Sequence, residues 1–191
     1  MRQIEGNRII LILGGVRSGK SRYAQQLAQG SRRVTFVATA ERRGDEEMRQ
    51  KIERHRAERP SHWTTVEEPI NLARIIASAA TDSDVVLIDC LTFFASNLLE
   101  AHGKNLALAQ PQIDDLCAAL QSASCAVILV SNEVGSGVVP AYALGRRFRD
   151  LAGEINQRVA AVADTVLLMV AGLPLALKGS ASKTQPSEAQ P

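Results

Sequence analysis

A short apolar run that breaks into a glycine-rich loop constrains this chain more than any other feature. The run RIILIL (residues 8–13) is followed by Gly14, by four further residues and then by Gly19, Lys20 and Ser21. This order is typical of a strand, a tight loop and a helix. Glycines let backbone N–H groups approach a phosphate, and the start of the following helix favours anions. The segment therefore predicts a phosphate-binding loop.

The charged and hydroxyl side chains of this loop have separate expected roles. Lys20 can reach the β- and γ-phosphates of a nucleoside triphosphate, and the Ser21 hydroxyl can bind Mg²⁺. A chance glycine turn without a ligand is the alternative. An apolar strand before the loop and a helical pattern after it favour the phosphate-binding interpretation.

Alternating strand and helix patterns along the chain indicate the fold class. Four more β-branched runs follow the first one, at residues 34–38, 84–89, 126–131 and 164–170. Between them, apolar residues recur every three or four positions, most clearly from Leu144 to Val162 and from Ile113 to Leu120. Continuous apolar strands that alternate with helices predict an α/β fold, a mainly parallel sheet with helices on both faces. We expect one domain over residues 1–178 and a disordered polar tail over 179–191.

Composition excludes several classes of protein. The chain has 191 residues, a formal net charge of +2 and no basic stripe, so nothing indicates a nucleic-acid partner. No apolar run approaches the ~20 residues that a membrane span requires. The cysteines are odd in number and lack metal-ligand spacing: Cys90, Cys117 and Cys125. We expect them to be reduced core residues of a cytoplasmic protein.

A phosphate loop needs an acidic partner for the metal ion. The run DVVLID ends in Asp89, and we expect this carboxylate at the end of a strand that neighbours the loop strand. A strand-ending acid that merely begins a turn is the alternative. The nearby phosphate loop favours a role for Asp89 on the Mg²⁺ side.

The stretch from residue 44 to 69 carries an unusually polar helical pattern. His55 has Lys51 and Arg59 four residues away on either side, and Arg56 follows it. A surface histidine on a solvated helix is one interpretation. The other is a nucleophile that attacks a phosphate, because neighbouring cations hold a polyanion and favour neutral imidazole. The residues alone leave both open.

Polar residues also follow the fourth predicted strand. Asn132 and Glu133 lie where open α/β sheets place ligands, although a glycine-rich turn there is often structural. Arg146, Arg147 and Arg149 then cluster near the start of the long helix. They fit either an anionic substrate or a solvated basic turn.

Taken together, these segments resemble one enzyme family. The motifs, in order, are GGVRSGKS, HRAERPSHW, VEEP, LIDCLT, SNEVGSGVVP and RRFRDLAGEINQRVAAVAD. In order and spacing they are similar to the bifunctional adenosylcobinamide kinase/adenosylcobinamide-phosphate guanylyltransferases of cobalamin biosynthesis. The likeness runs from about residue 8 to residue 178. The phosphate loop is common to many NTPases, so the other segments carry the resemblance.

The resemblance implies a RecA-like P-loop fold, a homotrimer and two reactions on a corrinoid substrate. In the first, GTP and/or ATP phosphorylates the hydroxyl group of adenosylcobinamide. In the second, a histidine attacks the α-phosphate of GTP, releases pyrophosphate and passes GMP to adenosylcobinamide phosphate. The product is adenosylcobinamide-GDP.

The resemblance also implies site residues. The nucleophile falls on His55, with Lys20 as the catalytic lysine, and Mg²⁺ falls on Ser21 and Asp89. The nucleotide contacts fall on Gly14, Gly15, Val16, Arg17, Ser18, Gly19, Lys20, Ser21, Ala38, Thr39, Ala40, Arg56, Ala57, Glu58, Arg59, Glu67 and Asp89. Two alternatives stay open: a plain P-loop small-molecule kinase in which His55 is a surface residue, and a GTP-dependent regulatory or binding module.

Overall fold

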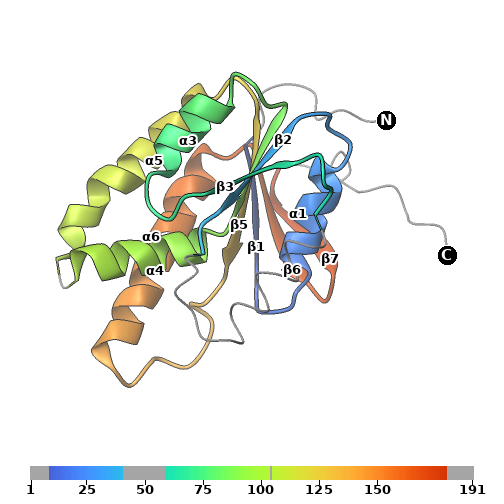
Figure 1. Cartoon of the computed structure of the whole chain (residues 1–191). Helices are drawn as coiled ribbons and strands as arrows, with labels where there is room; N and C mark the ends of the chain where they lie inside the picture. Colours follow the sequence, from blue (N-terminus) through green and yellow to red (C-terminus); the bar gives the residue numbers. More distant parts are fainter. Residues whose placement is uncertain (1–8, 41–58, 104, 180–191) are drawn as a thin grey trace.

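A single seven-stranded sheet organises the chain (Figure 1). The structure, a computed structural model, describes residues 9–40, 59–103 and 105–179. The strand order is β3-β2-β4-β5-β1-β6-β7. The bounds of the strands are β1 Ile9–Gly14, β2 Val34–Ala38, β3 Thr64–Glu67, β4 Val85–Asp89, β5 Ala126–Asn132, β6 Thr165–Val170 and β7 Leu173–Lys178. Every pair except β6–β7 is parallel, which confirms the predicted mainly parallel sheet.

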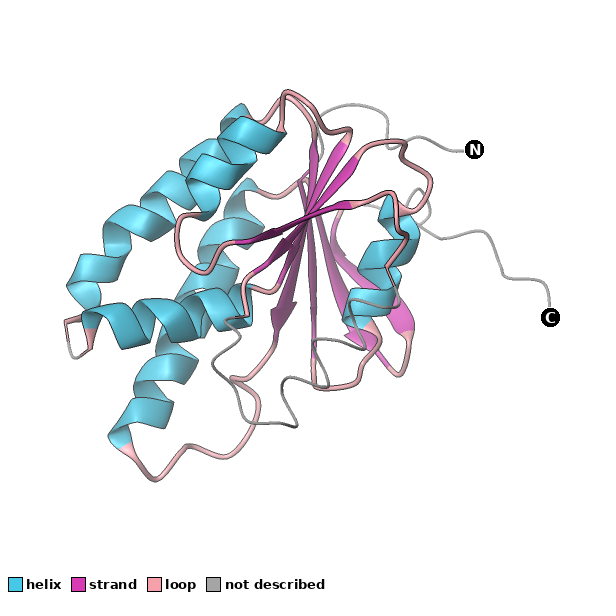
Figure 2. Ribbon diagram, viewed as in Figure 1, coloured by secondary structure: helices cyan, strands magenta, loops and turns pink. Residues whose placement is uncertain are grey.

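Helices cover both faces of the sheet, as predicted, but unequally (Figure 2). In the described part of the chain one face carries α1 (Lys20–Ala28). The other face carries α3 (Leu72–Ala79), α4 (Leu91–His102), the short 3₁₀ helix η1 (Leu106–Ala109), α5 (Gln110–Ser122) and α6 (Ala143–Val162).

Alternation along β1 divides the apolar residues between two cores. Leu11 and Leu13 pack with α3 to α6, whereas Ile10 and Ile12 pack with α1 and with Trp63. All four β1 residues are buried, which explains why the strand reads as one continuous apolar run. Burial of each such side chain contributes about 1.5–3 kcal/mol.

Two strands are absent from the sequence prediction, and both lie at sheet edges. β3 has four residues, three of them exposed. β7 contains Pro174 and presents exposed leucines at every second position. Short, half-exposed and proline-bearing strands are typical of sheet edges, where the apolar run that marks a central strand is not needed. The predicted tail lies outside the described residues beyond Gly179.

The long predicted helix is confirmed as α6, with one correction at its start. Leu151, Ile155 and Val159 are buried as the pattern predicts. Leu144, which the pattern places on the same face, is 59% exposed. Figure 1 shows the first turns of α6 extending past α4 at the lower end of the sheet. Periodicity reveals which residues share a face but not how far the sheet beneath it reaches.

All three cysteines are free, with Cys90 and Cys125 buried and Cys117 half-buried. Among the described helices, none combines the length and the apolar character needed to cross a membrane.

Candidate active site

The carboxyl ends of five parallel strands line up along one edge of the sheet. The pairing register brings the strand ends together: Ala38 of β2 pairs with Glu67 of β3 and with Asp89 of β4. Asp89 pairs with Val130 of β5, which extends two residues further to Asn132, the partner of Gly14 on β1. Open α/β sheets bind ligands outside these ends. Every described strand that carries a predicted nucleotide contact therefore ends at this edge.

The loop after β1 requires glycine at two positions. Gly14 has a φ of +153°, and a Cβ atom there would lie 2.6 Å from the backbone oxygen of Met169. Gly19 precedes α1 with a φ of +93°, a backbone conformation that L side chains rarely adopt. The backbone N–H of Ser18 turns back to the Gly15 carbonyl at 3.3 Å. The loop thus has the tight shape that the sequence predicts.

Lys20 lies inside this loop. It is the first residue of α1, only 8% exposed, and its Nζ donates a hydrogen bond to the Gly15 carbonyl at 2.6 Å. Ser21 follows on the first turn and is half-buried, while Val16 and Arg17 are exposed at the loop tip. A cation and a helix N-terminus therefore meet at one point, where they favour a phosphate group.

Asp89 ends β4 as predicted, but the expectation that β4 neighbours the loop strand is wrong. β5 lies between β1 and β4 in the sheet. Two inter-strand steps separate β4 from β1 by about 10 Å. Ser131 and Asn132 occupy the end of the intervening strand, paired with Leu13 and Gly14. Chain order did not reveal this arrangement because β5, which follows β4 in the chain, pairs between β4 and β1.

Hydrogen bonds fix the polar end of β5 on both sides. The Asn132 N–H donates to the Thr92 hydroxyl at 2.8 Å, and Asn156 of α6 donates to the Asn132 carbonyl at 3.1 Å. The Glu133 N–H donates to the Gly14 carbonyl at 3.1 Å. The polar segment after β5, with Glu133, is therefore bonded directly to Gly14 at the start of the phosphate loop.

The three predicted contacts after β2 differ in accessibility. Ala38 and Ala40 are half-buried, whereas Thr39 is completely buried. The Thr39 hydroxyl bonds to the backbone of Cys90, the residue after Asp89. In this structure its polar groups therefore face the protein interior.

Glu67, the last residue of β3, and Glu68, which follows it, have different environments. Glu67, the predicted nucleotide contact, is exposed. Glu68 is buried, and its Oε1 accepts hydrogen bonds from the N–H groups of Ile70 and Asn71 at 3.1 and 2.8 Å. Glu68 thus stabilises the start of α3 and leaves Glu67 as the accessible acid of the pair.

The segment that carries the predicted nucleophile lies outside the described residues, together with His55, Arg56, Ala57 and Glu58. Arg59, four positions after His55, is described. Its guanidinium carbon lies 3.5 Å from the centroid of the Phe36 ring on β2. This cation–π contact places Arg59 against the strand that ends at Ala38.

The other histidines lie away from this edge. His62 is exposed and precedes the amino end of β3. His102 is the last residue of α4, a helix that begins next to Asp89 and extends about 18 Å from it. Its ring contacts Gln112 of α5.

A buried thiol beside Asp89 is not a nucleophile at neutral pH. Burial, with a smaller contribution from the Asp89 carboxylate, raises the pKa of Cys90 from 9.0 to about 11. The thiolate form that attacks phosphorus or carbon centres is therefore scarce.

The basic cluster on α6 is engaged mainly within the protein. Arg146 donates to the carbonyl groups of Pro140 and Ala141 at 3.0 and 2.8 Å, and Arg149 pairs with Asp150 at 3.1 Å. The Arg146 bonds hold the loop before α6, whereas the Arg149–Asp150 pair lies within the helix. They favour the structural interpretation for Arg146 and Arg149.

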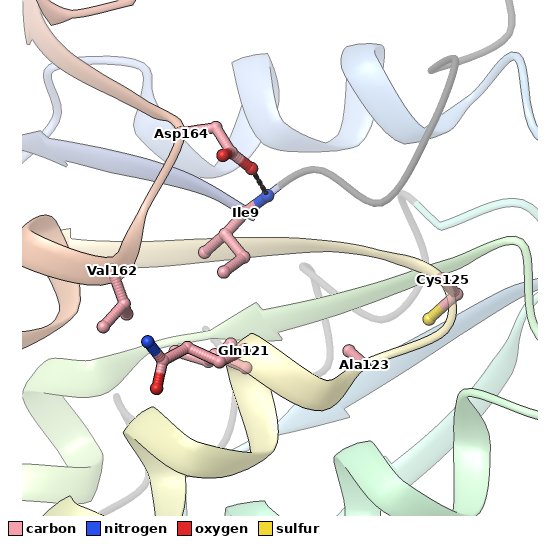
Figure 3. A pocket seen from close by; sticks show the side chains of 7 residues that line it. Ile9, Gln121, Ala123, Cys125, Val162 and Asp164 are labelled. Carbon is pink, nitrogen blue, oxygen red and sulfur yellow. Dashed lines mark hydrogen bonds between the residues drawn. The ribbon is translucent and has the colours of Figure 1, made fainter.

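A separate cavity of about 300 Å³ lies at the opposite edge of the sheet (Figure 3). Its lining includes Ile9, Cys125 and Asp164, which stand at or just before the amino ends of β1, β5 and β6. The Asp164 carboxylate accepts a hydrogen bond from the Ile9 N–H at 2.8 Å. This cavity therefore has no part in the phosphate site.

Comparison with known proteins decides which family this arrangement represents. The sequence profile of a family described as cobinamide kinase / cobinamide phosphate guanyltransferase matches residues 10–177. The chain belongs to this family. It is 41% identical over 181 residues to the bifunctional adenosylcobalamin biosynthesis protein CobU of Escherichia coli (strain K12), covering 89% of this chain and 99% of that protein. It is 45% identical over 170 residues to CobP of Pseudomonas aeruginosa, covering 88% and 96%.

Solved structures confirm the fold class. The assembled ATPase EscN of the enteropathogenic E. coli type III secretion system superposes with a TM-score of 0.57 at 13% identity. The match covers 86% of this chain and 43% of the ATPase. The predicted P-loop NTPase fold and the predicted bifunctional transferase family are therefore confirmed. The family description names two transfer reactions, so a plain kinase and a regulatory module are not supported.

Proposed function

We propose that this chain catalyses both reactions of its family at the carboxyl edge of the sheet and carries GMP on His55 between substrates. The observation that supports this proposal best is the buried Lys20 ammonium inside the loop after β1, on the edge that also holds Asp89 and Glu67. A preorganised cation at a helix N-terminus suits phosphoryl chemistry, whichever phosphate bond breaks.

Ser21 and Asp89 are the proposed Mg²⁺ ligands. Both supply hard oxygen donors, and Mg²⁺ usually takes one or two protein oxygens together with phosphates and waters. Within the described residues no cluster of three or more histidine, cysteine or acidic side chains forms a dedicated metal cage. This donor set fits an ion that arrives with the nucleotide. When bound, Mg²⁺ neutralises negative charge on the phosphates.

In the kinase reaction the chain positions a nucleoside triphosphate and an alcohol. The acceptor oxygen attacks the γ-phosphorus, the bond to the β-phosphate oxygen breaks, and the hydroxyl proton leaves to a base. The products are a phosphate ester and a nucleoside diphosphate. Lys20 and the loop N–H groups stabilise the charge that develops on the phosphate oxygens. This step needs no covalent intermediate on the protein.

In the guanylyl transfer we assign the nucleophile to His55. Its imidazole nitrogen attacks the α-phosphorus of GTP, pyrophosphate leaves, and a phosphate oxygen of the acceptor then displaces the imidazole. The other possible nucleophiles fit less well. The Cys90 thiol is protonated, and neither His62 nor His102 lies at the site edge. Arg56 and Arg59 supply positive charge near the histidine in the sequence.

Three finer points belong to this proposal. The acceptor is a corrinoid, adenosylcobinamide in the first reaction and its phosphate in the second. The working form is a homotrimer, which light scattering on the purified protein would check. The location is the cytoplasm, which fits three cysteines that form no disulfide.

Separate assays of the two reactions test the proposal. His55→Ala is expected to abolish guanylyl transfer and to leave phosphorylation of adenosylcobinamide within about twofold of wild type, because direct phosphoryl transfer needs no histidine. His62→Ala is the matched control and leaves both reactions unchanged. Equal loss of both reactions in a folded His55→Ala protein would show that His55 shapes a shared nucleotide site instead.

A further inference from the structure

Thr39 is completely buried although it stands at the site edge. It follows β2 directly, and its exposed fraction is 0%. Its N–H donates to the Asp89 carbonyl at 3.3 Å. Its hydroxyl donates to the Cys90 carbonyl and accepts from the Cys90 N–H, both at 2.7 Å. The Thr39 hydroxyl is therefore hydrogen-bonded within the protein on both its donor and its acceptor side.

Asn97 holds Thr39 in place. This α4 residue is only 8% exposed, and its side-chain amide donates to the Thr39 carbonyl at 2.9 Å and to the Pro69 carbonyl at 3.0 Å. Pro69 follows the end of β3 by two residues. One amide group therefore ties the chain after β2 and the chain after β3 to the helix that begins just beyond Asp89.

These bonds fix the backbone immediately around the Asp89 carboxylate. The Asp89 carbonyl, the Cys90 N–H and the Cys90 carbonyl all bond to Thr39. The peptide groups on the carboxyl side of Asp89 thus have no freedom to shift without breaking a buried hydrogen bond. Positional errors of about 1 Å in a ligand or catalytic group are enough to reduce function strongly.

We propose that Thr39, held by Asn97, is a positioning residue that sets the Asp89 carboxylate for the metal–nucleotide complex. The Thr39 hydroxyl acts through the position of Asp89. The inference rests on the proposed function, because it takes Asp89 as a ligand of nucleotide-bound Mg²⁺. The two bonds to Cys90 use one group that both donates and accepts, which a hydroxyl supplies.

The test compares one substitution that keeps the hydroxyl group with another that removes it. Thr39→Ser keeps both bonds to Cys90, whereas Thr39→Val keeps the shape and removes them. The measurement is GTP affinity by calorimetry, in Mg²⁺ and in EDTA. Thr39→Val is expected to weaken affinity in Mg²⁺ by about tenfold, the scale of a lost buried hydrogen bond, with affinity in EDTA unchanged. Thr39→Ser is expected to stay within about twofold.

A buried threonine on β2 itself provides the structural control. Thr35 is 7% exposed, and its hydroxyl bonds to the Ser83 hydroxyl at 2.8 Å, away from the site. Thr35→Val is expected to lower the melting temperature without altering the ratio of the Mg²⁺ and EDTA affinities. A merely structural role for Thr39 would give the same result for Thr39→Val.

A double-mutant cycle with Asp89→Asn separates the possible outcomes. If Thr39 acts through Asp89, Thr39→Val adds less than about twofold in the Asp89→Asn background. Full additivity, or a folded Thr39→Val protein with wild-type Mg²⁺ dependence, would overturn the inference. An Asp89→Asn protein with unchanged Mg²⁺ dependence would remove the metal role from Asp89 itself and this inference with it. If Thr39→Val does not fold, Asn97→Ala takes its place in the cycle with the same expected outcomes.

Discussion

The side-chain nitrogen of Lys20 lies 2.6 Å from the backbone oxygen of Gly15, inside the loop that both residues help to form. Only 8% of Lys20 is exposed, so its charge is held in place by the loop and not by solvent. A fixed cation in a partly dry site stabilises developing negative charge more than a mobile one does. We therefore expect Lys20 to stabilise negative charge on the phosphates in both reactions.

Lys20→Ala is therefore expected to reduce phosphorylation and guanylyl transfer together, each by on the order of 10²-fold or more. The two initial rates, measured with saturating nucleotide, check this expectation. Arg22→Ala is the control, because Arg22 is an exposed cation on the same helix. Loss of one reaction alone would contradict a shared role for Lys20.

A methyl group is expected to be tolerated at Gly15 but not at Gly14. Gly14→Ala would bring a Cβ atom within 2.6 Å of the Met169 carbonyl oxygen at a φ of +153°, whereas nothing lies within 4 Å of the corresponding position at Gly15. Gly14→Ala should lower the free energy of unfolding by roughly 1–3 kcal/mol. Gly15→Ala should change it by less than about 0.5 kcal/mol. Urea denaturation measures both, and equal losses would show that the loop geometry is wrong.

Alanine substitutions at two leucines of α6 test which turns of this helix are buried. Leu151 is 2% exposed and Leu144 is 59% exposed. Leu151→Ala is expected to cost about 2–5 kcal/mol of unfolding free energy, the range for buried leucines. Leu144→Ala should stay within about 0.5 kcal/mol. Comparable losses in urea denaturation would mean that the first turn of α6 is also packed.

Ionisation of the buried Cys90 thiol is expected to lower the free energy of unfolding in alkali. Because burial raises its pKa from 9.0 to about 11, the folded state binds the Cys90 proton more tightly than the unfolded chain does. The resulting stabilisation is complete below pH 9 and is lost as the pH rises from 9 to 11. Wild type should therefore lose more stability over this interval than Cys90→Ala, whose other titrating groups are the same. Parallel curves of unfolding free energy against pH would contradict the prediction.

Local patterns in the sequence were enough to predict the loop, its strand and helix, the central strands and most of α6. These features depend on neighbours a few positions apart, which periodicity records. The order of strands depends on pairing between distant segments, so the place of β5 between the loop strand and Asp89 was missed. β3 and β7 were missed because edge strands need no continuous apolar run.

The hydrogen bonds that support the site could not be predicted from the sequence either. Asn97 and Asn156 are single polar residues on otherwise apolar helix faces, and that interruption is the one signal that marks them. Their partners are the backbone carbonyl groups of Thr39, Pro69 and Asn132. Because every residue has a backbone carbonyl group, such partners cannot be identified from residue type. For the nucleophile, the sequence provides a prediction that the described part of the structure does not test. His55 was predicted from its motif, and it lies outside the described residues.

Direct capture of the covalent intermediate tests the central claim of this account. Purified protein is incubated with GTP labelled at the α-phosphate, in Mg²⁺ and without a corrinoid acceptor, and the label that stays on the denatured protein is counted. We expect label on wild type through a bond that is labile in acid and stable in alkali, as a histidine phosphoramidate is. We expect label on His62→Ala as well, and none on His55→Ala or from γ-labelled GTP. Labelling of a folded His55→Ala protein to the wild-type level would contradict the assignment of the nucleophile.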